Sequence, residues 1–234
     1  MKKELIFASF GLCPEQITFE TISALSKCGK IYITCGRREK VGLLLSLFPK
    51  AELISAIPFE VLILKVMGAF LKQDRVGVLD YGDPSFLCFF SKRLRLECLK
   101  NSIAFRKYRA VSSLNTIISD FCLGDLDPAG LYLATAHSWN VPSKFINPAV
   151  PLLLFSLDRV RLDGDPSGLL VRIVKDIQRV YPPQHDVYFI SCRNAAADKK
   201  RVRRVKVARL GKSLSALKFD TTIYIPAIVS PRQA

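Results

Sequence analysis

The residues best suited to ligand chemistry lie in a corner between a strand and a helix. The apolar run 76–80 ends abruptly at the corner 81–84, which reads Tyr-Gly-Asp-Pro. A strand ending in a Gly-Asp-Pro corner is how an α/β sheet presents backbone groups to a ligand at its carboxyl edge. Gly82 lets the backbone approach closely, and Asp83 and Pro84 suit the cap and first position of the next helix. The alternative interpretation is an ordinary strand–turn–helix junction.

Four further side chains are candidates for the same chemistry. Ser112 and Ser113 follow a strand-like segment, so they belong at the same sheet edge, either as ligand contacts or as a helix N-cap pair. Tyr81 offers a hydroxyl group, although packing is the favoured role for its ring. His137 directly follows the strand-like run 131–136 and is the best-placed general base, with a surface or structural histidine as the favoured alternative.

Composition narrows the class of protein. The chain has 234 residues, half of them hydrophobic, which is enough for a sizeable core. No stretch reaches the ~18 consecutive apolar residues of a membrane span. Glu4 interrupts the short apolar run at the N-terminus, so we expect a first strand there rather than a secretory signal. The seven cysteines are scattered, which favours reduced thiols in a cytoplasmic protein. With two histidines far apart, we predict no metal site.

The net charge of +15 gathers in three segments, 92–100, 106–109 and 198–212. Such clusters attract polyanions. The segment 201–210 interleaves valines with basic residues, as a strand with solvated basic positions does. No zinc-finger spacing, aromatic pattern or glycine-rich basic tail of a nucleic-acid-binding protein accompanies it. We therefore expect a solvated basic face or a site for an acidic partner, in preference to nucleic-acid recognition.

Strands and helices alternate over the first half of the chain. This pattern predicts an α/β domain whose sheet is largely parallel, with helices on both faces. The expected strands are 3–10, 30–35, 76–80 and 103–108, and segment 51–56 is expected as a short strand or a loop. The expected helices are 14–28, 41–48, 59–72, 85–100 and one capped by Ser112 or Ser113.

The pattern changes after Gly130. Several strands with a single helix predict a second α/β domain with a mixed sheet, and the turn-rich segment 124–130 places the boundary between domains 1–125 and 126–234. The expected strands are 131–136, 150–158, 186–192, 201–210 with a break at Gly211, and 221–229, and the helix is 167–181.

These segments, in this order, resemble the tetrapyrrole methylase superfamily of S-adenosylmethionine-dependent methyltransferases. The similar segments are 14–33, 76–86 with its Gly-Asp-Pro loop, 110–127 with its Ser-Ser pair, 181–191 and 219–227. The resemblance implies two α/β domains, S-adenosylmethionine bound in a cleft between them, and a homodimer. The positions that it implies for cofactor contacts are Tyr81, Gly82, Asp83, Phe86, Ser112, Ser113 and Ala134.

One branch of the superfamily is most similar. The segment 120–136 resembles the borosin-type enzymes, which methylate backbone amides of a peptide, at Asp120, Asp127, Pro128, Gly130, Ala134 and Thr135. Departures are also present. Ala8 and Phe10 stand at glycine positions of the family's first loop and Cys13 at its acidic position, and a phenyl ring there would fill space on the substrate side of the cleft. The segment 55–70 lacks the branch's Tyr/Arg/Tyr set.

Three hypotheses follow. The first is a methyltransferase that acts on a peptide or protein, because the chain most resembles that branch. The second is a C-methyltransferase of a tetrapyrrole, the commonest acceptor in the superfamily. The third is a catalytically inactive binding protein with the cofactor-binding fold, which the altered first loop motivates.

Overall fold

The computed structural model describes residues 2–34, 41–54, 57–123, 130–139, 146–157, 160, 164, 168–192, 201–214, 217 and 221–228. Its internal contacts separate the chain into two compact units, of which the first runs to Ile118 and the second begins at Ser119. The predicted division into 1–125 and 126–234 stays a prediction, because residues 124–129 lie outside the described part of the chain.

The first unit is built on a parallel five-stranded sheet, as the alternating pattern predicts. The strand order is β3-β2-β4-β1-β5, and every neighbouring pair is parallel. The strands are β1 (Glu4–Ser9), β2 (Lys30–Ile33), β3 (Glu52–Leu53), β4 (Arg75–Asp80) and β5 (Ala104–Lys107).

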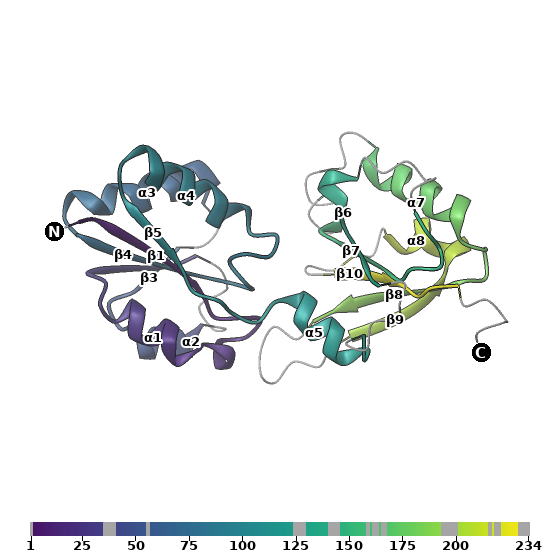
Figure 1. Ribbon diagram of the computed structural model, residues 1–234, viewed down its shortest axis with the longest axis horizontal. Coiled ribbons are helices and arrows are strands. Elements are labelled where there is room, and N and C mark those ends of the chain that lie inside the picture. The colour runs from purple at the N-terminus through teal and green to yellow at the C-terminus, as the bar shows by residue number, and fades with distance from the viewer. Residues whose placement is uncertain are drawn as a thin grey trace. The chain divides into compact units, whose positions relative to one another are not determined.

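Helices cover both faces of this sheet (Figure 1). The helices α1 (Phe19–Leu25) and α2 (Gly42–Leu47) lie on one face, and α3 (Phe59–Gly68) and α4 (Phe89–Lys100) lie on the other. Strand β1 supplies both layers, because alternate side chains of a strand point to opposite faces. Leu5 and Phe7 join the cluster under α3 and α4, whereas Ile6 and Ala8 join the one under α1 and α2.

Two of the predicted helices begin later than their sequences indicate. Helix α4 starts at Phe89 rather than at Ser85, with Cys88 as its N-cap. Leu87, just before the cap, has a left-handed backbone with φ of +52°, which a helix cannot include. The predicted helix 14–28 is a short 3-10 turn, η1 (Pro14–Gln16), followed by α1, whose N-cap Thr18 accepts a hydrogen bond from the N–H of Thr21.

The second unit has the predicted mixed sheet, in the order β6-β7-β10-β8-β9. Only β6 and β7 pair in parallel, and the other neighbours are antiparallel. One face carries α7 (Leu169–Val180) and α8 (Leu210–Leu214) (Figure 1). The division between the units, after Ile118, falls within helix α5 (Ser113–Asp120). No helix among the described residues combines the length and apolarity that a membrane crossing requires. The strands are β6 (Tyr132–Thr135), β7 (Leu152–Phe155), β8 (Asp186–Ser191), β9 (Arg201–Lys206) and β10 (Thr221–Ile225).

The predicted strand 201–210 is too long. Strand β9 ends at Lys206, and the chain continues as the 3-10 turn η6 (Val207–Arg209) and helix α8. Val207, Leu210 and Leu214 are spaced three and four residues apart, and all three are buried in the core of this unit. Gly211 therefore lies inside a helix and does not break a strand.

A substitution at Gly77 in β4 can measure how tightly α1 packs on the sheet. A Cβ atom at this position would lie 2.7 Å from Leu25 Cδ2 and 3.2 Å from Cys28 Sγ. Leu25 is fully buried, so its methyl group cannot move aside freely. We expect Gly77→Ala to lower the free energy of unfolding by about 1–3 kcal/mol, measured by urea titration. The control is Gly68→Ala in α3, where a Cβ meets nothing within 4 Å. Its helical backbone predicts a gain of about 0.5–1 kcal/mol, so equal losses would contradict close packing at Gly77.

Candidate functional site

The first sheet has a point where neighbouring strands continue toward opposite faces. Strands β1 and β4 are adjacent and parallel, yet β1 leads to α1 on one face and β4 leads to α4 on the other (Figure 1). In open α/β sheets, ligands bind at the carboxyl edge where such a reversal occurs. The loops that follow β1 and β4 therefore form the candidate site of this unit.

Two glycines join these loops. The N–H of Gly82 donates to the carbonyl of Gly11 over 2.8 Å, and both residues have left-handed backbones, with φ of +78° and +82°. Gln16 supports the first loop, because its Oε1 accepts a hydrogen bond of 2.7 Å from the N–H of Leu12. A Cβ atom at Gly82 would meet nothing within 4 Å. The backbone at Gly82 is thus fixed in shape and open to a close-approaching ligand.

Asp83 fastens the corner to the segment after β5. Its Oδ1 accepts from the N–H of Ser85 at 2.7 Å, and its Oδ2 accepts from the N–H of Ala110 at 2.9 Å. Lys107 Nζ adds a bond of 3.0 Å to Ser85 Oγ. The sequence offered Asp83 as the cap of the next helix. Asp83 does not have this role, because the N-cap of α4 is Cys88. Asp83 brings together the two segments that carry the predicted contacts, from Tyr81 to Phe86 and at Ser112 and Ser113.

The serine pair forms the start of α5. Ser112 Oγ accepts from the N–H of Asn115 at 3.2 Å and donates to Asn115 Oδ1 at 2.7 Å. These reciprocal bonds make Ser112 the N-cap, which confirms the alternative interpretation of this residue. Ser113 is the first residue of α5 and is partly buried. The ligand contacts predicted for both serines stay predictions.

Ala8, Phe10 and Cys13 are the residues of the first loop that depart from the family pattern, and the packing of Phe10 shows where this loop lies. The Phe10 ring is 4 % exposed and belongs to the cluster under α1 and α2. It meets the Tyr81 ring edge-on, with 6.1 Å between centroids. Ala8 and Cys13 are also buried. The phenyl ring therefore lies in the core of the first unit, with Tyr81 packed on it. Its predicted place on the substrate side of the cleft, and that of Tyr81 over the cleft, stay predictions.

Asp80, which sequence reasoning missed, organises the other side of the corner. Its Oδ1 accepts from Thr34 Oγ1 at 3.0 Å, and Cys88 Sγ lies 3.8 Å from its Oδ2. Burial, and then the charge of Asp80, raise the pKa of the Cys88 thiol to about 12. Cys88 Sγ also accepts from the N–H of Ser91 at 3.5 Å, so the protonated thiol links β4 to the start of α4. The available signal was a charged residue ending an otherwise apolar strand.

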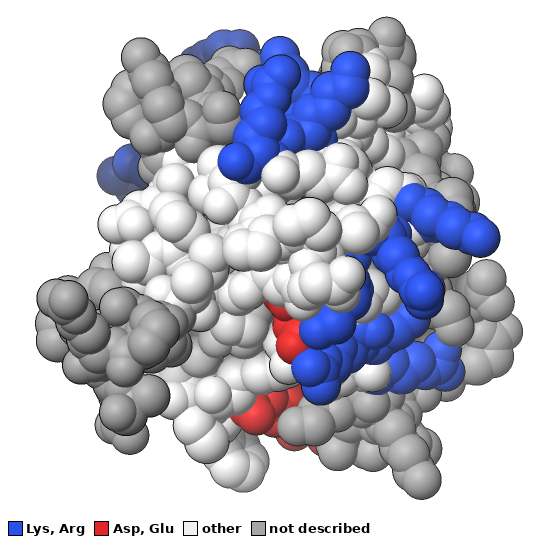
Figure 2. Space-filling view, turned by 90° about the vertical axis from the view of Figure 1, so that its right-hand side faces the viewer, with Lys and Arg blue, Asp and Glu red and all other residues white. Residues whose placement is uncertain are grey.

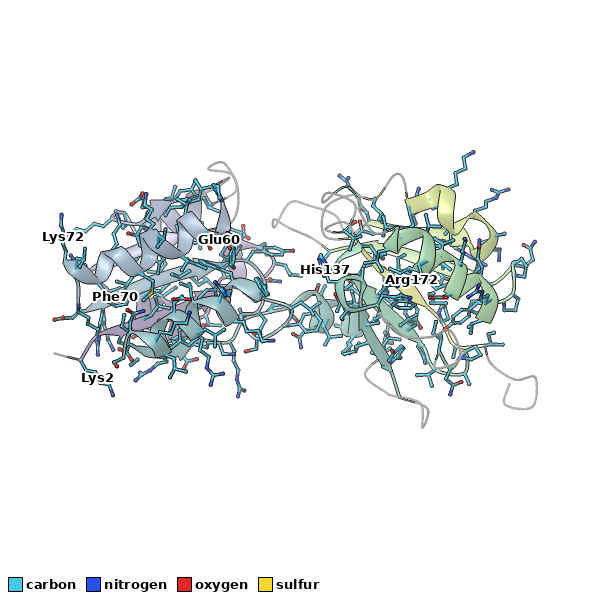
Figure 3. The ribbon with its side chains drawn as sticks, turned by 90° about the horizontal axis from the view of Figure 1, so that it is seen from above. Lys2, Glu60, Phe70, Lys72, His137 and Arg172 are labelled. Carbon is cyan, nitrogen blue, oxygen red and sulfur yellow. The ribbon has the colours of Figure 1, made fainter. Side chains whose placement is uncertain are left out.

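In the second unit, His137 lies on a turn that α7 holds in place. It belongs to η4 (Ala136–Ser138), directly after β6 and the partly buried Ala134, and it is exposed. Trp139 beside it is buried and donates from Nε1 to Asp176 Oδ2 at 3.1 Å. Arg172 Nη2 donates to the Trp139 carbonyl at 2.9 Å. Figure 3 labels His137 and Arg172 in this unit. The role of His137 as a base stays a prediction.

The edge therefore offers a ligand an open backbone at Gly82 and the partly buried rings of Tyr81 and Phe86. Most polar side chains around it are engaged in fixing the loops. Among the described residues, no three His, Cys, Asp or Glu side chains gather as a metal ion would require.

Comparison with known proteins identifies the fold. No protein-family model matches the chain, and no curated protein matches its sequence.

Solved structures do match the fold of the chain. The uroporphyrin-III C-methyltransferase from Thermus thermophilus has a TM-score of 0.69 at 18% identity, over 97% of this chain and 93% of that one. The same enzyme complexed with S-adenosylhomocysteine has a TM-score of 0.69 at 17% identity, over 95% and 92%. Cobalt precorrin-4 methyltransferase, CbiF, has a TM-score of 0.72 at 12% identity, over 95% and 94%. The chain thus has the two-domain α/β fold of these methyltransferases.

The two hydrogen bonds that the Asp83 carboxylate accepts predict that its removal lowers the stability of the fold. Asp83→Ala leaves the N–H groups of Ser85 and Ala110 without their acceptor, so we expect the free energy of unfolding to fall by about 1–3 kcal/mol. Asp83→Asn keeps one acceptor and should lose about half as much. The control is Asp74→Ala, an exposed position, which should change stability by less than about 0.5 kcal/mol. Chemical unfolding measures all three, and equal values for Asp83→Ala and Asp74→Ala would contradict this role.

The raised thiol pKa values predict an order of alkylation. Burial raises the pKa of Cys28 to about 11 and that of Cys98 to about 12, in addition to Cys88. A raised pKa keeps the thiol protonated, so at pH 8 a group of pKa 12 is thiolate only in a fraction on the order of 10⁻⁴. Iodoacetamide at pH 8 should therefore label exposed Cys122 long before these three, as followed by peptide mass spectrometry. Rapid labelling of Cys88 in the folded protein would contradict its place in the Asp80 cluster.

Proposed function

We propose that the protein is an S-adenosylmethionine-dependent methyltransferase that holds its cofactor against the Gly82 corner. The observation that carries the proposal is the open, left-handed backbone of Gly82 at the point where β1 and β4 diverge. A Cβ atom there would occupy space that the protein itself leaves free, which fits a ligand held through backbone groups. Support also comes from the fold, since one similar enzyme was crystallised with S-adenosylhomocysteine.

The residues at this edge have distinct tasks in the proposed reaction. Bound S-adenosylmethionine supplies a methyl group activated by its sulfonium charge, so the protein's main task is positioning. Gly82 offers its backbone, and Tyr81 and Phe86 offer ring faces, while Asp83 and Ser112 keep both loops in place. Ser113 and Ala134 are further proposed contacts. Tyr81 and His137 are the candidates for accepting a proton from the acceptor.

The acceptor in this proposal belongs to one of two classes. A tetrapyrrole is the acceptor named for the similar uroporphyrin-III C-methyltransferase, and the net charge of +15 suits an acceptor that carries several carboxylates. A peptide acceptor is supported by the resemblance of segment 120–136 to the borosin-type branch. Methyl transfer from isotope-labelled cofactor to uroporphyrinogen III and to short peptides separates them. The homodimer that the resemblance implies is also part of the proposal, and sedimentation equilibrium measures it.

Cofactor binding tests the proposal directly. We expect calorimetry to detect both S-adenosylmethionine and S-adenosylhomocysteine. Gly82→Ala should weaken the binding of both compounds by at least about tenfold, because the added methyl group enters the space assigned to the ligand. The matched control is Gly168→Ala, because Gly168 is also left-handed, with φ of +61°, and a Cβ there also meets nothing within 4 Å. It carries the same backbone strain but lies outside the proposed site, so its affinity should match that of the wild type.

The outcomes distinguish the hypotheses. No heat with either ligand at millimolar concentration overturns the proposal. Binding without methyl transfer to any acceptor identifies the inactive cofactor-fold protein. Equal affinity losses in Gly82→Ala and Gly168→Ala would show that strain, and not occupation of the site, caused the effect.

A further inference from the structure

Strand β9 leaves one long edge of the second sheet without a strand partner among the described residues. It pairs with β8 on one side and is the last strand in the order β6-β7-β10-β8-β9. The other edge strands of the two sheets, β3, β5 and β6, have two, four and four residues, whereas β9 has six. Arg201 to Arg204 are exposed. Proteins usually keep edge strands short because they are templates for pairing.

The register identifies the backbone groups that face outward. The N–H of Val207 donates to the carbonyl of His185, which extends the β8–β9 ladder by one step. Bonded and non-bonded pairs alternate in an antiparallel ladder, so Val205, Arg203 and Arg201 also bond to β8. Val202, Arg204 and Lys206 therefore direct their N–H and C=O groups away from β8. No described residue bonds to the N–H groups of these three residues or to the carbonyls of Val202 and Arg204. The Lys206 carbonyl, at the N-cap of η6, is used by the first bond of that turn.

The side chains along this edge are basic and partly held in place. Arg204 and Lys206 both pair with Asp186, at 2.5 and 2.7 Å. Their hydrogen bonds, together with their positive charge, lower the pKa of the Asp186 carboxyl group. On the other face of the strand, the Arg203 guanidinium lies 4.8 Å from the centre of the Phe189 ring and donates to the Ser213 carbonyl. Fixed side chains lose less entropy when they bind a partner.

The surroundings of β9 extend the basic surface. An open hollow beside the strand is lined by Asp186, Arg204, Val205, Lys206 and Arg209. Arg209 and Lys212 follow on η6 and α8, and both are exposed. Figure 2 shows lysine and arginine side chains gathered on this face of the unit, with few acidic ones among them. One aspartate is shared by two basic residues here, so the edge keeps a net positive charge.

We propose that β9 binds an acidic polypeptide segment in extended form, as an additional strand on its free edge. Main-chain bonds to Val202, Arg204 and Lys206 would hold the segment, and its carboxylates would meet the basic side chains on either face. A second copy of this chain does not fit, because two β9 edges would place arginine against arginine. Single-stranded nucleic acid fits less well, because the exposed large apolar residues on β9 and α7 are valines, which offer no stacking surface.

The first experiment uses the full-length wild-type protein and a fluorescent peptide that alternates glutamate with valine. Fluorescence anisotropy should give a micromolar Kd that weakens roughly tenfold between 50 and 300 mM salt. A second peptide is methylated on the nitrogen of each valine and glutamate, which keeps the charges and removes the donors. It should bind at least about tenfold more weakly, since it cannot form a ladder.

Two variants test the edge from the protein side. Val202→Pro removes an N–H that faces away from β8, so the native ladder is kept while strand addition is blocked. Val202→Thr keeps this N–H and is its control. The double variant Arg201→Gln/Arg204→Gln removes two charges from β9. Lys2→Gln/Lys72→Gln removes two exposed charges from the first unit, where Figure 3 labels both lysines. Circular dichroism and urea unfolding check the fold of each variant.

Binding that is lost in Val202→Pro and in the double β9 variant, and retained in both controls, supports the proposal. Equal binding of the methylated peptide would overturn it, because charge alone would then explain the affinity. The absence of binding, or tighter binding of a ten-nucleotide oligothymidylate than of the peptide, would overturn it as well. None of these outcomes depends on cofactor binding, so the result is independent of the proposed enzymatic activity.

Discussion

The parallel ladder between β1 and β4 is the constraint on which the first unit and its candidate site depend. Its register runs in six pairs, from Glu4 with Arg75 to Ser9 with Asp80, and every residue of β1 is buried. A slip of one residue would exchange the two core layers, since Leu5 and Phe7 serve one face and Ile6 and Ala8 the other. Past both strands, Phe10 N–H bonds to the Asp80 carbonyl, and Gly82 N–H bonds to the Gly11 carbonyl in an isolated antiparallel bridge. The shape of the site is therefore set by the burial of apolar side chains some distance from it.

This constraint explains why the polar residues near the edge are used for support. Asp83 holds two backbone N–H groups, Ser112 caps α5, and Asp80 meets Thr34 and Cys88. Loops at a sheet edge carry many backbone groups that strands no longer satisfy, and nearby side chains meet that requirement. What remains available to a ligand is largely backbone, at a glycine. In the proposed function, such a site would hold its ligand by shape and backbone hydrogen bonding, which suits a reaction whose catalysis is mainly positioning.

Sequence reasoning succeeded where the signal is local. Period-two and period-three-to-four patterns gave the strands, the helix layers and the change to a mixed sheet, and the serine pair indicated the start of α5. It failed where the outcome depends on contacts distant in sequence. Nothing near Phe10 shows that its ring turns into the core toward Tyr81, or that Gly11 bonds to Gly82. The late start of α4 was hidden because Leu87 adopts a left-handed backbone without being glycine.

The basic segment 201–210 also shows where prediction from local sequence ends. Alternating valine and arginine predicted a strand with solvated charges, and β9 is such a strand up to Lys206. The continuation to Leu210 carries both periods, because Val205 and Val207 are two residues apart, as on one face of a strand, while Val207 and Leu210 are three apart, as on a helix face. Burial in the core decides for the helix. Composition also gives the charge of this segment, but it does not show which of its backbone groups bond to β8 and which face away. Only the pairing of Val207 with His185 shows that the residues facing the free edge include Arg204 and Lys206. Where backbone donors and positive side chains coincide on one edge, charge protects the strand from its own copies and favours an acidic partner.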